Sequence, residues 1–227
     1  MESNTEKKSL SDIAYSQIKN MLLEFELHPG SAVTEIMFMQ KFGISRTPVR
    51  QALQRLEQEG FMRLTPRKGW FVAGVSLRDI QEIFVVREAL EGIAARLAAE
   101  LLPQEVLDGL NLYMEKISSQ EQTKDIDEVD PGDILHEKIF EAVNNQQMNR
   151  VLRLYNDQLR RFHIMASKLP GRALLSYKEH YEILRALTER NGEKAEKAMR
   201  EHINSSKRSI LDAVVNESYG KWFECQP

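Results

Sequence analysis

The helical spacing of apolar residues from Ser76 onward constrains the fold more than any other feature of the sequence. Ser76 and Asp79 form a capping-box signature, and apolar residues then recur at helical intervals: Ile80, Ile83, Phe84, Leu90, Ala94 and Leu97. Breaks divide the region at Leu102-Pro103, residues 118–132, Asn144-Asn145, Pro170-Gly171 and Asn191-Gly192. Because no strand pattern alternates with these helices, residues 76–220 predict an all-α bundle of about six helices.

The first part of the chain has a different rhythm. Short helical patterns and a His28-Pro29-Gly30 turn come first, and a stretch rich in β-formers follows from Phe61 to Ala73. A chain of 227 residues is long enough to bury two separate cores. We therefore expect a small N-terminal domain over residues 8–75 and a mainly α protein as a whole.

A helix-turn-helix pattern lies within this first domain. Apolar residues recur on its first helix: Ile36, Met39 and Phe42. Gly43 provides the turn, and Ser45 is a natural N-cap for the second helix. Pro48 falls in the first turn of that helix, where its missing N–H costs no hydrogen bond.

The second helix of this motif has one apolar and one polar face. The apolar face holds Val49, Ala52, Leu53 and Leu56, which we expect in the core. The polar face holds Arg46, Thr47, Arg50, Gln51 and Gln54. The N-terminal end of a recognition helix enters the major groove, where arginine reads guanine or clamps a phosphate. We therefore expect Ser45, Arg46, Thr47, Arg50 and Gln51 to contact DNA.

A β-hairpin is predicted after this helix. The runs Phe61–Thr65 and Trp70–Val72 flank Pro66-Arg67-Lys68-Gly69, which makes a cationic tip. Such a wing suits the DNA backbone or the minor groove. Arg67, Lys68 and Gly69 are therefore further candidate DNA contacts.

Charge separates the DNA-binding hypothesis from the alternative of a merely solvated basic helix face. The net charge of −3 excludes a uniformly basic surface, but not a local basic patch. Residues 41–68 hold seven basic and two acidic side chains, a local charge of +5. No acidic residue of this window falls on the recognition face, so DNA binding is favoured.

Three histidines of the second domain lie on predicted apolar faces: His136, His180 and His202. His180 comes eleven residues before Asn191 and His202 eleven after it, so an antiparallel helix pair brings both to about the same height. Asp133 lies three residues before His136, on the same helix face. One aspartate and three histidines suit a divalent ion, with zinc first and nickel or manganese as the other candidates.

Alternatives remain open for several of these residues. Asp133 either ligates the metal or satisfies backbone donors in the first turn of its helix. Arg87 and Glu91 form either an ordinary intrahelical ion pair or an orienting pair under an effector pocket. We expect His163 to line that pocket together with Arg87.

The sequence resembles a family of transcription regulators. The residues that carry the resemblance are His28-Pro29-Gly30, Ser45-Arg46-Thr47-Pro48-Val49-Arg50, Leu56, Glu59-Gly60 and Gly69, which look like the GntR-family signature. Residues 87–91 and the histidines resemble the FCD-type effector domain of the FadR subfamily. The number of predicted helices resembles that of its VanR-like six-helix branch. The resemblance implies a metal site. Where the family usually has an aspartate four residues before the first histidine, this chain has Gly132, and Ile36 replaces an arginine of some relatives.

These observations together predict a ligand-responsive transcription regulator and not an enzyme. A homodimer would bind a palindromic operator in double-stranded DNA, because two-fold protein symmetry matches two-fold DNA symmetry. A small carboxylate would bind in the helical domain, with repression as the expected effect. The single cysteine, Cys225, suits a reducing compartment, and no stretch suits a membrane span, so we expect a cytoplasmic protein.

Two other hypotheses follow from the same residues. The histidines and Asp133 would also suit a metal-dependent enzyme that activates water, with no role for DNA. No glutamate stands in an evident general-base motif beside the histidines, which disfavours that alternative. The third hypothesis is a metal-free bundle with a purely structural role.

Overall fold

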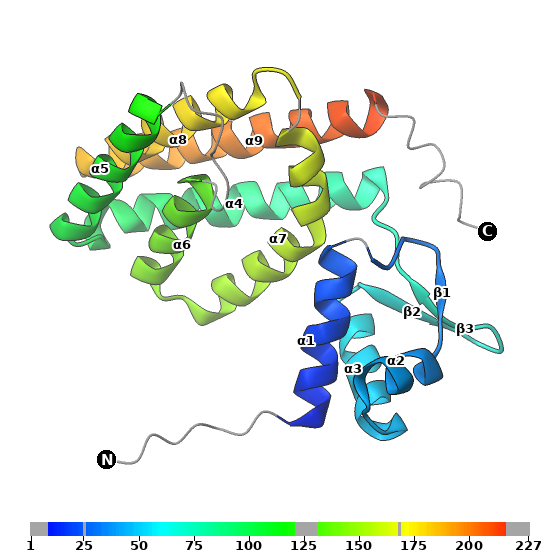
Figure 1. Ribbon diagram of the computed structural model, residues 1–227. Coiled ribbons are helices and arrows are strands. Elements are labelled where there is room, and N and C mark those ends of the chain that lie inside the picture. The colour runs from blue at the N-terminus through cyan, green and yellow to red at the C-terminus, as the bar shows by residue number, and fades with distance from the viewer. Residues whose placement is uncertain (1–8, 25, 121–130, 168, 217–227) are drawn as a thin grey trace, which may run out of the picture. The chain divides into compact units, whose positions relative to one another are not determined.

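The computed structural model describes residues 9–24, 26–120, 131–167 and 169–216 of the chain. The chain divides into two compact units, with the boundary between Ser76 and Leu77 (Figure 1). Over the described residues the fold is mainly α, with a winged helix-turn-helix first and a helical bundle second, as predicted. None of the described helices is long and apolar enough to cross a membrane.

The first unit combines three helices with a small antiparallel sheet. Its elements are α1 (Leu10–Leu23), β1 (Ala32–Val33), α2 (Glu35–Phe42), α3 (Arg46–Gln58), β2 (Met62–Thr65) and β3 (Gly69–Val72). The sheet order is β1-β3-β2, and β2 and β3 form the predicted hairpin, with Thr65 opposite Gly69. The wing is therefore confirmed.

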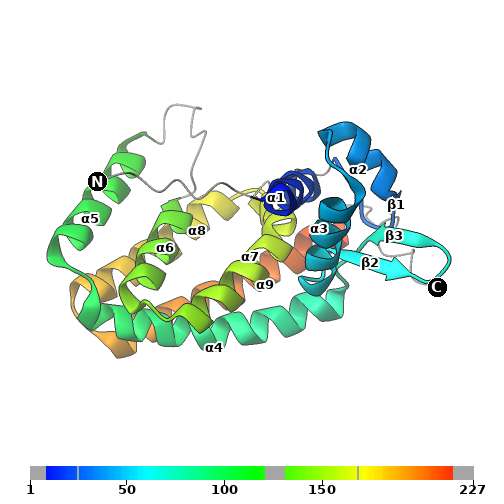
Figure 2. The ribbon, with the colours of Figure 1, turned by 90° about the horizontal axis from the view of Figure 1, so that it is seen from below.

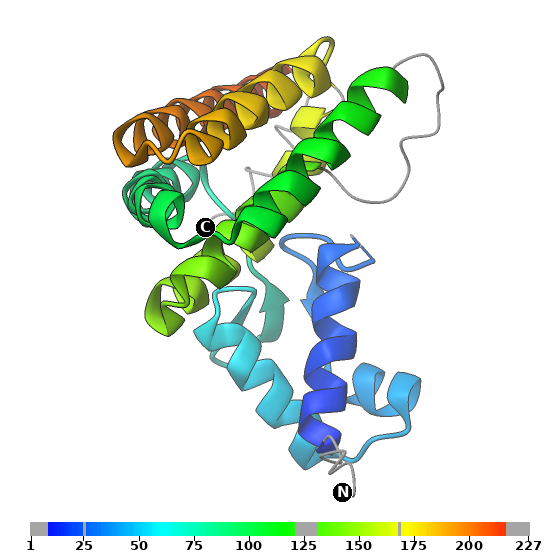
Figure 3. The same ribbon diagram turned by 90° about the vertical axis from the view of Figure 1, so that its left-hand side faces the viewer.

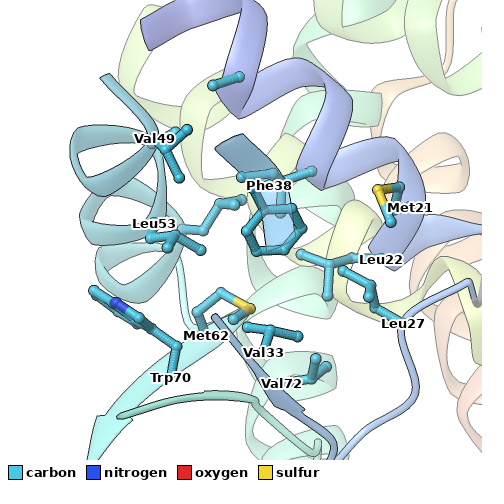
Figure 4. Packing of buried hydrophobic residues seen from close by; sticks show 14 of the residues in the cluster. Met21, Leu22, Leu27, Val33, Phe38, Val49, Leu53, Met62, Trp70 and Val72 are labelled. Atoms are coloured by element: carbon cyan, nitrogen blue, oxygen red, sulfur yellow. The ribbon is translucent and has the colours of Figure 1, made fainter. Parts of the chain in front are cut away.

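The core of the first unit lies where α1, α2 and α3 cover the sheet. Figure 4 shows the Phe38 ring between Leu53 of α3 and Leu22 of α1. The predicted apolar face of α3 is confirmed, since Val49, Ala52, Leu53 and Leu56 are fully buried.

The predicted stripe on α2 is wrong at Ile36, which is 52% exposed. Phe38 takes the core-facing position instead and stacks on Phe42 with ring centroids 5.8 Å apart. Ile36 lies two residues before Phe38, which is about 200° around the helix and so on the far side.

The second unit contains six helices over the described residues, in agreement with the prediction. They are α4 (Leu77–Leu101), α5 (Gln104–Gln120), α6 (Pro131–Val143), α7 (Gln146–Ser167), α8 (Arg172–Thr188) and α9 (Gly192–Asn216). Four of the predicted breaks coincide with helix ends. The predicted break at residues 118–132 begins too early, because α5 continues to Gln120. Residues 121–130 of this break lie outside the described part of the chain.

The two long helices α4 and α9 pack along each other, and α8 lies antiparallel beside α9 (Figures 2 and 3). The C-terminal half of α4 buries alanines on its inner face: Ala94, Ala95, Ala98 and Ala99. Leu97, part of the predicted apolar pattern, is 43% exposed, because it lies about 100° around the helix from the buried Ala98.

Candidate functional site

The N-terminal end of α3 is presented by a tight turn. Gly43 ends α2 with a left-handed backbone (φ 67°), which suits a residue without Cβ. Ser45 occupies the N-cap position of α3, as predicted, but its side chain makes no capping hydrogen bond. Its hydroxyl therefore lies at a helix N-terminus, where backbone N–H groups favour an anion.

The polar face of α3 is open to solvent. The Arg46 and Arg50 side chains are 62% and 59% exposed, and Thr47 and Gln51 are also exposed. The structure thus presents four of the predicted DNA contacts on one exposed surface. We call it the reading face, formed by Arg46, Thr47, Arg50 and Gln51.

One acidic residue from outside the counted window of residues 41–68 lies at the reading face. Glu35, the first residue of α2, has one carboxylate oxygen 3.3 Å from Arg46 Nε and the other 4.0 Å from Arg50 Nε. The charge count missed Glu35 because it lies before the counted window and reaches α3 only across the turn.

The tip of the wing carries the predicted cations. Arg67 and Lys68 are exposed between β2 and β3, and the Lys68 N–H donates to the Thr65 carbonyl at 3.1 Å. Gly69 has a φ of 94°, which strains any other residue. This glycine keeps the hairpin tip in its observed shape.

The second unit brings together three of its histidines. His136 of α6, His180 of α8 and His202 of α9 each offer a ring nitrogen, and these nitrogens lie within 4.8 Å of one another. The ring centroids of His180 and His202 are only 4.3 Å apart, and both side chains are buried. We call this group the histidine cluster; its composition can hold a divalent metal ion.

Carboxylate groups contact two of these rings at Nδ1. His136 Nδ1 lies 2.7 Å from Glu91 Oε2, and His202 Nδ1 lies 2.9 Å from Glu179 Oε2. A ring whose Nδ1–H donates to a carboxylate keeps the Nε2 lone pair for a metal, as in carboxylate–histidine–zinc arrangements. His180 Nδ1 lies 3.4 Å from Ser176 Oγ.

The protonation of His180 and His202 also suits metal binding. Burial lowers the pKa of His180 to about 3, with His136 and Arg172 adding to the effect. Burial likewise holds the pKa of His202 well below its usual range. Both rings are therefore neutral near pH 7, which is the form that binds a metal ion.

Arg87 and Glu91 form an ion pair that is also part of the cluster's support. Arg87 Nε lies 2.6 Å from Glu91 Oε1, while the other oxygen of Glu91 faces His136. Burial alone would raise the pKa of the Glu91 carboxyl, but Arg87 and His136 outweigh it and lower that pKa to about 2. The pair is therefore intrahelical and also contacts a histidine, while its place under an effector pocket stays a prediction.

His163 of α7 lies beside Arg87 and not in the cluster. Arg87 Nη1 donates to His163 Nε2 at 3.1 Å, which requires an unprotonated nitrogen. Burial and the neighbouring guanidinium lower the pKa of His163 to about 3. The structure therefore places the two predicted pocket residues side by side.

Sequence reasoning missed a second buried charged group. Arg172 Nη1 contacts Glu179 Oε2 at 3.2 Å and Ser205 Oγ at 3.3 Å, and Glu179 in turn faces His202. Arg172 and Glu179 lie seven residues apart, two turns along one face of α8. That spacing of opposite charges on one face of a helix was the available signal.

The fourth predicted ligand does not join the histidines. Asp133 is exposed near the start of α6 and is not in the cluster. Gly132 is buried against the cluster: a Cβ atom built there would collide with the His180 ring. A side chain at position 132 would therefore point at the cluster, and this chain has none to offer there.

Both units are similar to known protein families. Residues 10–72 match the model for bacterial regulatory proteins of the gntR family, and residues 82–205 match the FCD domain. A transcriptional regulator of Streptomyces ambofaciens is 30% identical over 208 residues, covering 88% of this chain and 83% of the relative. The transcriptional repressor RspR of Escherichia coli (strain K12) is 24% identical over 212 residues, covering 92% and 91%.

Solved structures show the same fold. The structure of E. coli McbR/YncC has a TM-score of 0.71 at 22% identity, covering 91% of this chain and 99% of that chain. The chain belongs to the GntR family of bacterial regulatory proteins, carries an FCD domain, and is a DNA-binding transcription regulator and not an enzyme.

Proposed function

We propose that this regulator is a cytoplasmic, homodimeric repressor that leaves a palindromic operator when a small carboxylate binds at a metal ion in its FCD domain. The observation that carries the proposal is the buried histidine cluster, supported from outside by Glu91 and Glu179, in the same chain as an exposed reading face. The first unit supplies DNA recognition and the second supplies the response.

DNA recognition is assigned to the start of α3 and to the wing. Arg46, Thr47, Arg50 and Gln51 would enter the major groove, and Ser45 would approach a phosphate at the helix N-terminus. At the wing, Arg67 and Lys68 would follow the backbone or the minor groove, with Gly69 shaping the tip.

Metal binding is assigned to His136, His180 and His202. Three imidazoles suit zinc first and nickel next, whereas manganese prefers oxygen ligands. Asp133 would become a fourth ligand only after moving from its exposed position. A bound ion supplies positive charge and open positions, which attract a carboxylate effector.

The effector is assigned to the region between the cluster and α7. The buried Arg87 guanidinium provides a fixed positive charge there, and His163 beside it accepts from Arg87 Nη1 and keeps Nδ1–H as a donor. Binding would release the operator by favouring one of two arrangements of the reading units.

Metal-dependent release of DNA tests this function. The operator is a duplex enriched by the protein from a randomised pool, and its affinity is measured by fluorescence anisotropy with a panel of mono-, di- and hydroxycarboxylates. We expect at least one carboxylate to weaken operator binding by about 5- to 150-fold in zinc-loaded protein. Chelator-treated protein is the control and should not respond. If no carboxylate of the panel changes the operator affinity of zinc-loaded protein, the proposed response is contradicted.

Dimerisation is assigned to an apolar face of α4. Leu90, Ile93, Leu97 and Leu101 recur at helical spacing, and the last three are 40%, 43% and 53% exposed. A second copy of the chain would cover this face, because a two-fold interface uses the same patch on both subunits.

Charging this face should separate the subunits. Ile93→Glu with Leu97→Glu would bury two carboxylates against an apolar partner face, so we expect the mass from light scattering to fall to that of one chain. The matched control is Leu112→Glu with Leu174→Glu, on leucines that are 54% and 46% exposed on α5 and α8. A dimer that survives the first pair of changes would refute this interface.

A further inference from the structure

Glu35 lies against both arginines of the reading face. It is the first residue of α2 and follows Thr34, whose hydroxyl accepts from the Met37 N–H at 3.2 Å and so fixes the start of this helix. The Glu35 side chain is only 20% exposed, while those of Arg46 and Arg50 are about three times more exposed, at 62% and 59%. The carboxylate therefore lies beneath the two guanidinium groups and not in front of them.

Both ion pairs run through the Nε atoms. Arginine has N–H groups on Nε and on two terminal nitrogens, and the terminal pair can make two parallel hydrogen bonds with guanine O6 and N7. A carboxylate at Nε leaves these terminal groups available and restricts the rotation of the side chain. The two arginines are thus oriented before DNA arrives, which reduces the entropy lost on binding.

The negative charge has a second effect. It weakens the attraction of Arg46 and Arg50 for phosphates on every DNA sequence, whereas orientation helps only where guanine stands in the matching place. We propose that Glu35 is a positioning residue that sets operator specificity, by orienting both arginines and by reducing their binding to unrelated DNA. This inference rests on the proposed DNA interface.

The test compares two duplexes in the full-length protein. One is enriched by the wild type from a randomised pool, and the other is a shuffled duplex of the same composition. For Glu35→Gln we expect affinity for the shuffled duplex to rise about threefold and operator affinity to fall about threefold. The ratio of the two affinities therefore falls about tenfold.

Two further variants separate positioning from charge and from folding. Glu35→Asp keeps the charge but shortens its reach, so we expect the ratio to fall without tighter binding to the shuffled duplex. Glu26→Gln is the matched control, since Glu26 is 48% exposed and pairs with Lys41 at 2.9 Å. It removes the same charge from the same unit and should leave the ratio unchanged. Thermal unfolding of each variant checks that the unit remains folded.

The outcomes distinguish this inference from the proposed function. A wild type that enriches no duplex would overturn the DNA interface and, with it, the role of Glu35. If the wild type enriches a duplex and the Glu35→Gln variant has the same affinity ratio as the wild type, the role of Glu35 alone is overturned. A wild-type affinity ratio in the Glu35→Asp variant would also overturn the positioning role of Glu35. A reduced ratio in the Glu26→Gln variant would do the same.

Discussion

Replacing Arg46 and Arg50 together by alanine should abolish sequence-specific DNA binding while the first unit stays folded. Both side chains are mostly exposed and contribute little to the core, which Val49, Leu53 and their neighbours form. Each arginine that reads a base pair contributes about 1–3 kcal/mol of discrimination, and two are lost in each subunit. We expect operator affinity, measured by fluorescence anisotropy, to fall at least 100-fold, which is on the order of the free energy that the removed contacts supply.

The control for this experiment removes two cations elsewhere. Arg185→Ala with Lys197→Ala changes the net charge equally, on side chains that are 58% and 78% exposed on α8 and α9. This variant should bind the operator as the wild type does. Unaltered operator affinity in the Arg46 and Arg50 variant would show that another surface reads the DNA.

The double variant His180→Ala and His202→Ala should lose its bound metal. The two rings are the closest pair of the histidine cluster, with centroids 4.3 Å apart, and His136 alone cannot hold an ion tightly. We expect about one ion per wild-type subunit by mass spectrometry after dialysis, and less than about a tenth of that in the variant, in line with the loss of two of three ligands.

His163→Ala is the matched control for metal loss. His163 is a histidine of the same unit beside Arg87, but it lies outside the cluster. This variant should keep its metal, and its response to zinc in thermal unfolding should persist. One ion per subunit in the His180 and His202 variant would place the metal elsewhere.

Much of the fold could be predicted because it depends on neighbours along the chain. The helix ends near Pro103, Asn144 and Gly171 follow from residues that break helices locally. The buried face of α3 follows from helical spacing alone. The convergence of His180 and His202 was also predictable, since both lie the same number of residues from one turn between antiparallel helices.

Other features depend on contacts between distant parts of the chain. Glu35 reaches Arg46 and Arg50 across a turn, and Glu91 meets His136 forty-five residues later in the chain. Asp133 and Gly132 are neighbours in sequence, but only Gly132 is buried against His180. A one-residue difference in helical phase, about 100°, decides which position faces the cluster.

The sequence by itself determined the helix-turn-helix, the turn that presents α3, the cationic wing and the three histidines, because helix breaks, caps and spacing act over a few residues. Only the tertiary structure decided which charges meet: Glu35 with the reading arginines, and Glu91 and Glu179 with the histidines. Side chains from separate helices approach one another only when their apolar faces pack, and that packing sets distances which no local pattern contains.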